Sequence, residues 1–312
     1  MLRFLAKAAG YLILTVVLAV TAALAWLRWE SGLSREAWFD ERRGRIVAVE
    51  SEESPTAHGQ LSEFATLRSD TGLTVSLRVI RGDPDEDTLP VLIVLGGHRT
   101  GSDAVELFGD VGERAVVALD YPYDGPERVR GLLPVLRTIP AARQAFLDTP
   151  PAVSLVLDWL HDQPWVNREQ LVIVGASLGV PFAATAAARD ERITGVLLVH
   201  GAADNRLWLE AQVARRIDAR FLHRPLGTIL HWLAYGSSFK TAERIASVAP
   251  RPVLIIGARD DERTPAGQTE LLFAAAGEPK KLRWTEGLHI EPGRTEIIDE
   301  LLRIADEELP FD

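Results

Sequence analysis

The chain has 312 residues, of which 47% are hydrophobic, and a formal net charge of −10 at pH 7. This composition supports a sizeable core and excludes global disorder, while the acidic balance argues against a nucleic-acid partner, which would select a basic face. There is no cysteine, so thiol catalysis, disulfides and cysteine-based metal sites are excluded. Beyond an apolar N-terminal segment, about 275 residues remain, which is within the range of one large α/β domain.

The N-terminal segment is strongly apolar. Residues 8–27 carry no charged side chain, and a helix of this length spans a hydrocarbon core of roughly 30 Å. Arg3 and Lys7 precede the apolar run, so the positive-inside rule predicts a cytoplasmic N-terminus and an exported remainder. We therefore predict a membrane anchor over residues 1–30, with the rest of the chain outside the cytoplasm.

A cleaved signal peptide is the alternative interpretation of the same segment. Ala23-Leu24-Ala25 fits a small-x-small cleavage site, although the apolar run is longer than the usual core of a signal peptide. Arg28 and Arg35, beyond the run, weaken the predicted orientation. Cleavage would give a secreted protein in place of an anchored one.

The segments that follow predict a parallel sheet. Residues 31–62 are charged and irregular and are expected to form a linker. Residues 64–80 alternate on either side of Asp70-Thr71-Gly72, which indicates a β-hairpin extending one end of the sheet. Short apolar strands then alternate with helices, as is typical of a parallel sheet covered on both faces. These strands are expected at 91–95, 115–120, 171–174, 193–201, 251–257 and 281–287.

Residues 171–179, LVIVGASLG, contain the predicted nucleophile. An apolar strand enters a G-x-S-x-G turn, and a helix with Pro181 near its first turn is expected to follow. Such a turn exposes the Ser177 hydroxyl at a helix N-terminus, where developing negative charge is favoured. Gly175 and Gly179 suit the turn because it brings neighbouring backbones close together.

A serine nucleophile needs a base, and the base needs an orienting acid. His289, in the segment WTEGLHIEPG just past a predicted strand, is the preferred base among seven histidines. His200 also ends a predicted strand, but it follows the strand after the nucleophile helix. We expect His200 to be structural or a neighbour of the pocket.

The acid is expected just past the strand that ends at Gly257. Asp260 is three residues beyond that glycine, and Asp261 is four residues before Pro265. The spacing does not separate the two, and we prefer Asp260 because the distance from the strand end should fix position better. Helix capping is the other role open to both, and Asp204 is a third candidate.

The order Ser177, then Asp260 or Asp261, then His289 is the order expected of a nucleophile elbow. The segments VLGGHRTG, GASLG, GARDDERTP and TEGLHI resemble those of the α/β-hydrolases, and the resemblance covers residues 64–308. LDWLHDQPWVNREQLVIVGASLG is similar to dienelactone-hydrolase-like and prolyl-oligopeptidase-like members.

The resemblance implies an α/β-hydrolase domain over residues 63–312, with a mostly parallel central sheet, helices on both faces and an N-terminal transmembrane helix before it. Residues 204–250, which interrupt the β/α alternation, fall where this family inserts a helical cap. Their load of large apolar side chains suggests an apolar small-molecule acyl substrate bound beneath the cap.

The resemblance also implies an oxyanion hole made of two backbone N–H groups. One maps onto Leu178, and the other onto Gly97 or His98. The sequence departs here from the common His-Gly pattern, because the loop reads Leu95-Gly96-Gly97-His98. The choice between the last two positions therefore stays open.

The implied function is serine esterase activity. A Ser-His-Asp triad would hydrolyse a carboxylic ester or thioester through an acyl-enzyme, and this chemistry needs no metal and no organic cofactor. A peptidase of the prolyl-oligopeptidase-like type and a non-catalytic binding protein with the α/β-hydrolase fold are the alternative functions.

Overall fold

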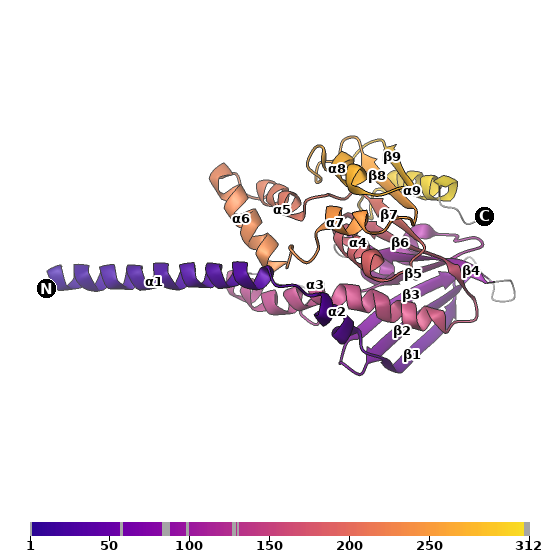
Figure 1. Cartoon of the computed structure of the whole chain (residues 1–312), viewed down its shortest axis with the longest axis horizontal. Coiled ribbons are helices and arrows are strands. Elements are labelled where there is room, and N and C mark those ends of the chain that lie inside the picture. The colour runs from indigo at the N-terminus through magenta and orange to yellow at the C-terminus, as the bar shows by residue number, and fades with distance from the viewer. Residues whose placement is uncertain are drawn as a thin grey trace.

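The computed structural model describes residues 2–56, 59–82, 88–97, 100–126, 129 and 131–308. Within these ranges the centre of the protein is a nine-stranded sheet in the order β1-β2-β3-β5-β4-β6-β7-β8-β9 (Figure 1). The strands are β1 Ile46–Pro55, β2 Leu61–Ser69, β3 Thr74–Arg81, β4 Leu89–Leu95, β5 Ala115–Leu119, β6 Val166–Ala176, β7 Gly195–Val199, β8 Val253–Ala258 and β9 Lys280–Thr285.

The sheet has an antiparallel end and a parallel remainder. β1, β2 and β3 pair antiparallel with their neighbours, and β3 also pairs antiparallel with β5. The pairs from β5 through β4 to β9 are all parallel. The hairpin predicted at the start of the sheet is therefore confirmed. The central strands read as continuous apolar runs because both of their faces are buried.

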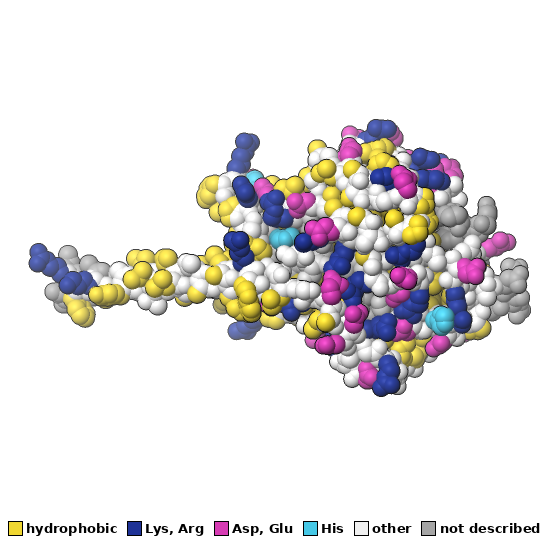
Figure 2. All heavy atoms as spheres, in the orientation of Figure 1, with side chains coloured by type: hydrophobic (Ala, Val, Ile, Leu, Met, Phe, Trp, Pro, Cys, Tyr) yellow, Lys and Arg dark blue, Asp and Glu magenta, His cyan; other side chains and the backbone are white. Residues whose placement is uncertain are grey.

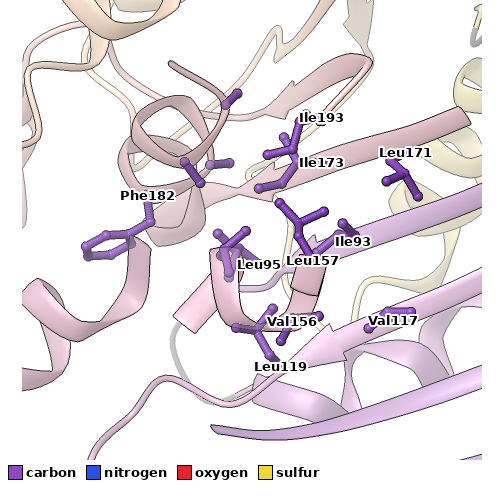
Figure 3. Packing of buried hydrophobic residues seen from close by; sticks show 14 of the residues in the cluster. Ile93, Leu95, Val117, Leu119, Val156, Leu157, Leu171, Ile173, Phe182 and Ile193 are labelled. Carbon is purple, nitrogen blue, oxygen red and sulfur yellow. The ribbon is translucent and has the colours of Figure 1, made fainter. Parts of the chain in front are cut away.

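Helices cover both faces of the sheet. One face packs against α2, α3, α4, α7 and α8, and the other against η1 and α9. Figure 3 shows part of the first layer, where Leu157 of α3 lies beside Ile93 and Val156 lies beside Leu119. The helices are α1 Leu2–Ser31, α2 Glu36–Arg43, η1 Gly101–Phe108, α3 Leu132–His161, α4 Val180–Arg189, α5 Asn205–Ala214, α6 Arg220–Leu233, α7 Thr241–Ala246, α8 Gln268–Ala275 and α9 Thr295–Glu308.

The predicted linker over residues 31–62 is wrong. This segment forms α2, whose Phe39 is only 2% exposed in the core beside α3, and the edge strand β1. β1 lacks an apolar pattern because it lies at the edge of the sheet with most of its side chains in solvent. Charged side chains are common on such an edge because they oppose pairing with other chains.

The segment 204–250 divides into two parts. α5 and α6 pack against each other and project from the body (Figure 1). α7 instead packs against α4 and α8, within the layer of helices on the sheet. The projecting pair α5–α6, with the turn between its helices, is called the cap from here on. The cap is therefore shorter than the segment expected from the sequence.

α1 extends away from the body (Figure 1). Residues Lys7–Ser31 have a mean hydropathy of 2.2, and the helix is long and apolar enough to cross a membrane, a test that a signal sequence also passes. Its last turns contact the body, where Leu27 and Ser31 are buried. Glu30 forms an ion pair with Arg143 of α3 and accepts a hydrogen bond from the Tyr235 hydroxyl.

Candidate active site

Ser177 lies at a sharp turn between β6 and α4. Its φ is +53°, a left-handed conformation that costs a non-glycine residue about 1–2 kcal/mol. A Cβ on Gly175 would lie 2.6 Å from the Cβ of Ala183, and one on Gly179 would collide with the carbonyl oxygen of Leu95. Both glycines are therefore needed for β6 and α4 to meet at this turn, as the sequence predicted.

His289 faces the Ser177 hydroxyl. Its Nε2 lies 2.7 Å from Ser177 Oγ, and the ring is fully buried. The Nδ1 atom lies 2.9 Å from Asp261 Oδ2 and 3.0 Å from Oδ1. An ionised carboxylate only accepts hydrogen bonds, so Nδ1 carries the proton and Nε2 is left to accept from the serine. This is the arrangement in which an imidazole can remove a hydroxyl proton.

The carboxylate at His289 belongs to Asp261, and the preference for Asp260 is corrected. The backbone pairing of β8 with the β9 segment continues past the last strand residue, because the Asp260 N–H donates to the carbonyl of Gly287. Because of this extra pairing, the chain turns toward His289 only after Asp260, and Asp261 is the residue that reaches the imidazole. Asp260 remains exposed.

Asp261 also begins a turn that its own side chain stabilises. Its Oδ1 accepts the backbone N–H groups of Arg263 and Thr264, each at 2.8 Å. Burial would raise the pKa of the Asp261 carboxyl, but the hydrogen bond and charge of His289 and these two N–H groups bring the pKa below its usual value. The carboxylate is therefore ionised at neutral pH. The third candidate, Asp204, is the N-cap of α5 and accepts from Arg206 and Leu207.

Two residues that the sequence did not single out hold the backbone of His289. Glu262 Oε2 accepts the His289 N–H at 2.9 Å. Arg294 donates both to Glu262 Oε1, at 3.1 Å, and to the His289 carbonyl. Burial alone would raise the pKa of Glu262, yet these partners keep it below its ordinary value. Neither residue has a sequence signal, because their roles arise from contacts between distant loops.

His200 also holds the loop that contains His289. Its Nδ1 accepts the N–H of Ile290 at 2.8 Å, and its Nε2 lies 3.1 Å from the hydroxyl of Thr285. Burial, with a smaller contribution from the charge of His289, lowers the pKa of His200 to about 4. His200 is therefore neutral at pH 7 and acts as a structural neighbour of the site.

His200, Asp261 and His289 bring ligand atoms within 4.8 Å of one another, a grouping that could hold a metal ion. Each ring nitrogen already has a hydrogen-bond partner, among them Ser177 and the backbone of Ile290. A metal would have to replace these hydrogen bonds. The serine–histidine–aspartate arrangement explains the grouping without one.

The candidate oxyanion donors lie beside Ser177. Leu178 follows the serine in η2 (Ser177–Gly179). A Cβ on Gly97 would lie 3.8 Å from the Cβ of Ser177, so this loop passes beside the serine side chain. The preceding carbonyl, of Gly96, accepts from the hydroxyl of Tyr121 at 2.7 Å, which fixes the loop. His98, the alternative donor, lies outside the described residues.

Two cavities meet at Ser177 and Leu178. A cavity of about 70 Å³ lies on the α3–α4 side, against Phe146, Phe182 and Phe239. A cavity of about 750 Å³ runs along the other face of the sheet, between η1 and α9, a size typical of ligand pockets. Apolar side chains of the strands and of α9 line its interior, among them Leu92, Val94, Val174, Leu197, Leu301 and Leu302.

The sequence matches one family model over part of its length and is similar to one bacterial protein. A model of the prolyl oligopeptidase family (Peptidase_S9) matches residues 151–292, a range that includes Ser177, Asp261 and His289. "Uncharacterized protein YfhR" of Salmonella typhimurium (strain LT2) is 28% identical over 218 residues, which cover 67% of this chain and 67% of that protein.

The structure is similar to those of known esterases. The acetyl xylan esterase from Paenibacillus sp. R4 aligns with a TM-score of 0.62 at 15% identity, covering 86% of this chain and 93% of that one. Acetyl xylan esterase 1 from Thermoanaerobacterium sp. JW/SL YS485 gives a TM-score of 0.59 at 15% identity, covering 89% and 97%. The fold is that of the α/β-hydrolases. The match to the prolyl oligopeptidase family falls within this fold and includes the turn at Ser177.

Proposed function

We propose that this protein is a serine hydrolase that cleaves carboxylic esters or thioesters, with Ser177 as nucleophile, His289 as base and Asp261 as orienting acid. The observation that carries the proposal is the continuous chain of hydrogen bonds, 2.7 Å from Ser177 Oγ to His289 Nε2 and 2.9 Å from His289 Nδ1 to Asp261. A non-catalytic binding protein has no need of these three side chains in this hydrogen-bonded arrangement, so the geometry favours catalysis.

The proposed reaction has two halves. Ser177 Oγ attacks the acyl carbon while its proton passes to His289 Nε2, and that proton then leaves with the departing alcohol or thiol. Water attacks the acyl-enzyme and gives its proton to the same nitrogen, which returns it to Ser177 as the acid departs. Asp261 holds the imidazole and stabilises its protonated form during each half.

The negative charge of each tetrahedral intermediate would be bound by backbone N–H groups of Leu178 and of Gly97 or His98. Preorganised donors of this kind act without reorganisation during the reaction, and losing one typically costs about 10²–10³ in rate. The hydrogen bond from Tyr121 to Gly96 supports such preorganisation because it fixes the loop beside the serine.

An apolar acyl group is the proposed substrate feature. The two cavities that meet at Ser177 are lined mainly by aliphatic and aromatic side chains, and a pocket of this composition favours apolar ligands. Esterases among the structures with this fold support ester chemistry. We test the proposal with nitrophenyl esters of increasing chain length, and expect hydrolysis by the native protein and none above background by Ser177→Ala.

A peptidase is the second candidate, and the match to the prolyl oligopeptidase family favours it. The same triad would act on an amide, so substrate comparison separates the two functions. Peptide nitroanilides are tested beside the nitrophenyl esters. Faster turnover of the nitroanilides, measured as kcat/KM, would replace the esterase proposal with the peptidase.

We further propose that α1 anchors the protein in a membrane with the hydrolase domain outside the cytoplasm. The apolar span Lys7–Ser31 and the basic Arg3 and Lys7 at its start support this orientation. Membrane fractionation and the mass of the mature chain test it. A soluble form about 25 residues shorter would indicate signal-peptide cleavage and secretion.

A further inference from the structure

We propose that the cap and the start of α3 rest on the surface of the bilayer that holds α1, and that the substrate is an acyl ester dissolved in that bilayer. This inference rests on the proposed esterase function and the proposed membrane anchor, and it extends them to a substrate class. It follows from how the anchor joins the body, from the side chains that flank the joint and from where the cavities lie.

The joint between α1 and the body is fixed. Ser31 is 1% exposed, and only four residues separate the end of α1 from the start of α2 at Glu36. Glu30 pairs with Arg143 of α3 and with Arg35, and accepts from Tyr235, which follows α6. The body therefore cannot turn freely about a linker, and a membrane around α1 would always face the same side of it.

That side of the body carries exposed apolar side chains. In Figure 1 the N-terminal end of α3 lies beside the last turns of α1, and α6 projects outward from the base of α1, on the side of the body from which α1 extends. Leu133 on α3 and Phe221 on α6 are 69% and 79% exposed, and Leu136 and Leu230 are exposed as well. Trp29 in the last turn of α1 is exposed at the same end, and aromatic rings favour the membrane interface.

The cap tip is also basic, in contrast to the acidic chain as a whole. Residues 215–224 contain four arginines and one aspartate, whereas the protein has a net charge of −10. All four arginines are exposed: Arg215, Arg216, Arg220 and Arg224. Arg215 donates to the carbonyl oxygen of Glu262, and Arg216 lines the larger cavity. Arg220 and Arg224, at the start of α6, have no ion-pair partner among the described residues. In Figure 2 the projecting end combines apolar and basic side chains. This combination matches a surface of anionic lipid headgroups.

The catalytic cavities lie directly behind this surface. Phe146 of α3 lines both cavities one helical turn from Arg143, which holds Glu30. Ala234 and Gly236 line the smaller cavity on either side of Tyr235, the other partner of Glu30. The walls of the smaller cavity and the contacts at the base of α1 are therefore built from the same two segments.

The size of the larger cavity suits a long acyl chain. Its 750 Å³ lies well within the range of about 300–1,000 Å³ found for ligand pockets, and its interior is aliphatic. Esters with long acyl chains partition into bilayers because burial of each methylene from water is favourable. An enzyme fixed at the bilayer surface would meet such an ester there at high local concentration.

The experiment uses the full chain reconstituted in phosphatidylcholine vesicles with or without phosphatidylglycerol. Because the chain has no cysteine, Phe221→Cys accepts a single environment-sensitive dye, and Leu271→Cys on α8, exposed in the native protein, is the matched control. We expect a blue shift of the dye at position 221 in anionic vesicles and none at 271. An unshifted dye at position 221 would overturn the proposal. The same shift in detergent without vesicles, growing as the protein concentration rises, would also overturn it and would indicate contact with a second protein molecule.

Activity gives a second readout. Arg220→Gln/Arg224→Gln should lower kcat/KM for a long-chain acyl ester embedded in the anionic vesicles by roughly ten-fold, while a soluble short-chain ester is hydrolysed as before. Arg68→Gln/Arg303→Gln removes two exposed charges elsewhere and should change neither rate. Equal effects of the two double variants would refute bilayer docking. Absence of hydrolysis of both esters by the native protein would instead refute the esterase function, and the dye shift would then still report on docking.

Discussion

Replacement of Asp261 by asparagine tests the geometry of the candidate triad most sharply. Oδ1 of Asp261 accepts the backbone N–H groups of Arg263 and Thr264 at 2.8 Å, and this contact would retain the oxygen of an asparagine. The amide NH₂ would then occupy the position of Oδ2 and point at His289 Nδ1. His289 would have to accept there and carry its proton on Nε2, facing Ser177, so it could no longer act as a base.

The expected loss is about 10⁴ in kcat, or about 5 kcal/mol of transition-state stabilisation, the size measured when the triad aspartate of a serine protease is replaced in this way. The assay is nitrophenyl ester hydrolysis at pH 7. Urea unfolding should show little change, because the backbone hydrogen bonds of the turn remain. Asp260→Asn is the matched control and should retain native activity. A loss below ten-fold for Asp261→Asn, or an equal loss in the control, would refute the assignment.

Two further predictions concern the framework of the site. The pKa of His200 is lowered to about 4 in the folded protein, so as pH falls from 6.5 toward 4 protons bind the unfolded chain first, and about 3 kcal/mol of stability should be lost. Urea unfolding across this range measures the slope, which His200→Gln should reduce; equal slopes would contradict the structural role. Gly179→Ala should destabilise the protein by about 3 kcal/mol or more because its Cβ collides with the Leu95 carbonyl. Gly293→Ala, where a Cβ meets open space, should leave the thermal midpoint unchanged, and an equal shift in both variants would refute the steric argument.

The sequence was most informative where local pattern and tertiary environment agree. The G-x-S-x-G turn identified Ser177 because a strand, a tight turn and a helix must follow one another directly there. His289 could be selected because only seven histidines exist and one follows a late strand. The parallel strands were predictable because burial on both faces demands continuous apolar runs.

The choice between Asp260 and Asp261 failed because it depends on a contact between two chain segments. The hydrogen bond from Asp260 to Gly287 extends the pairing past β8 by an amount that spacing along the chain does not encode. The contacts of Glu262 and Arg294 with His289 have the same origin. Each joins loops that are distant in the sequence.

The edge strand β1 could not be predicted from the sequence, for a different reason. β1 is mostly exposed and acidic, so it lacks the alternation that identifies a strand with one buried face. The extent of the cap was overestimated because the interruption of the β/α alternation continues to residue 250 and therefore includes α7. Only packing distinguishes α7, which lies against α4 and α8.

The central claim is that Ser177 forms the acyl-enzyme, and labelling by a fluorophosphonate tests it most directly. Mass spectrometry of the digested protein should locate the adduct on Ser177. Ser177→Ala should remain unlabelled, and His289→Ala should react far more slowly while keeping its fold. An adduct on another residue, or equal labelling of Ser177→Ala, would contradict the account.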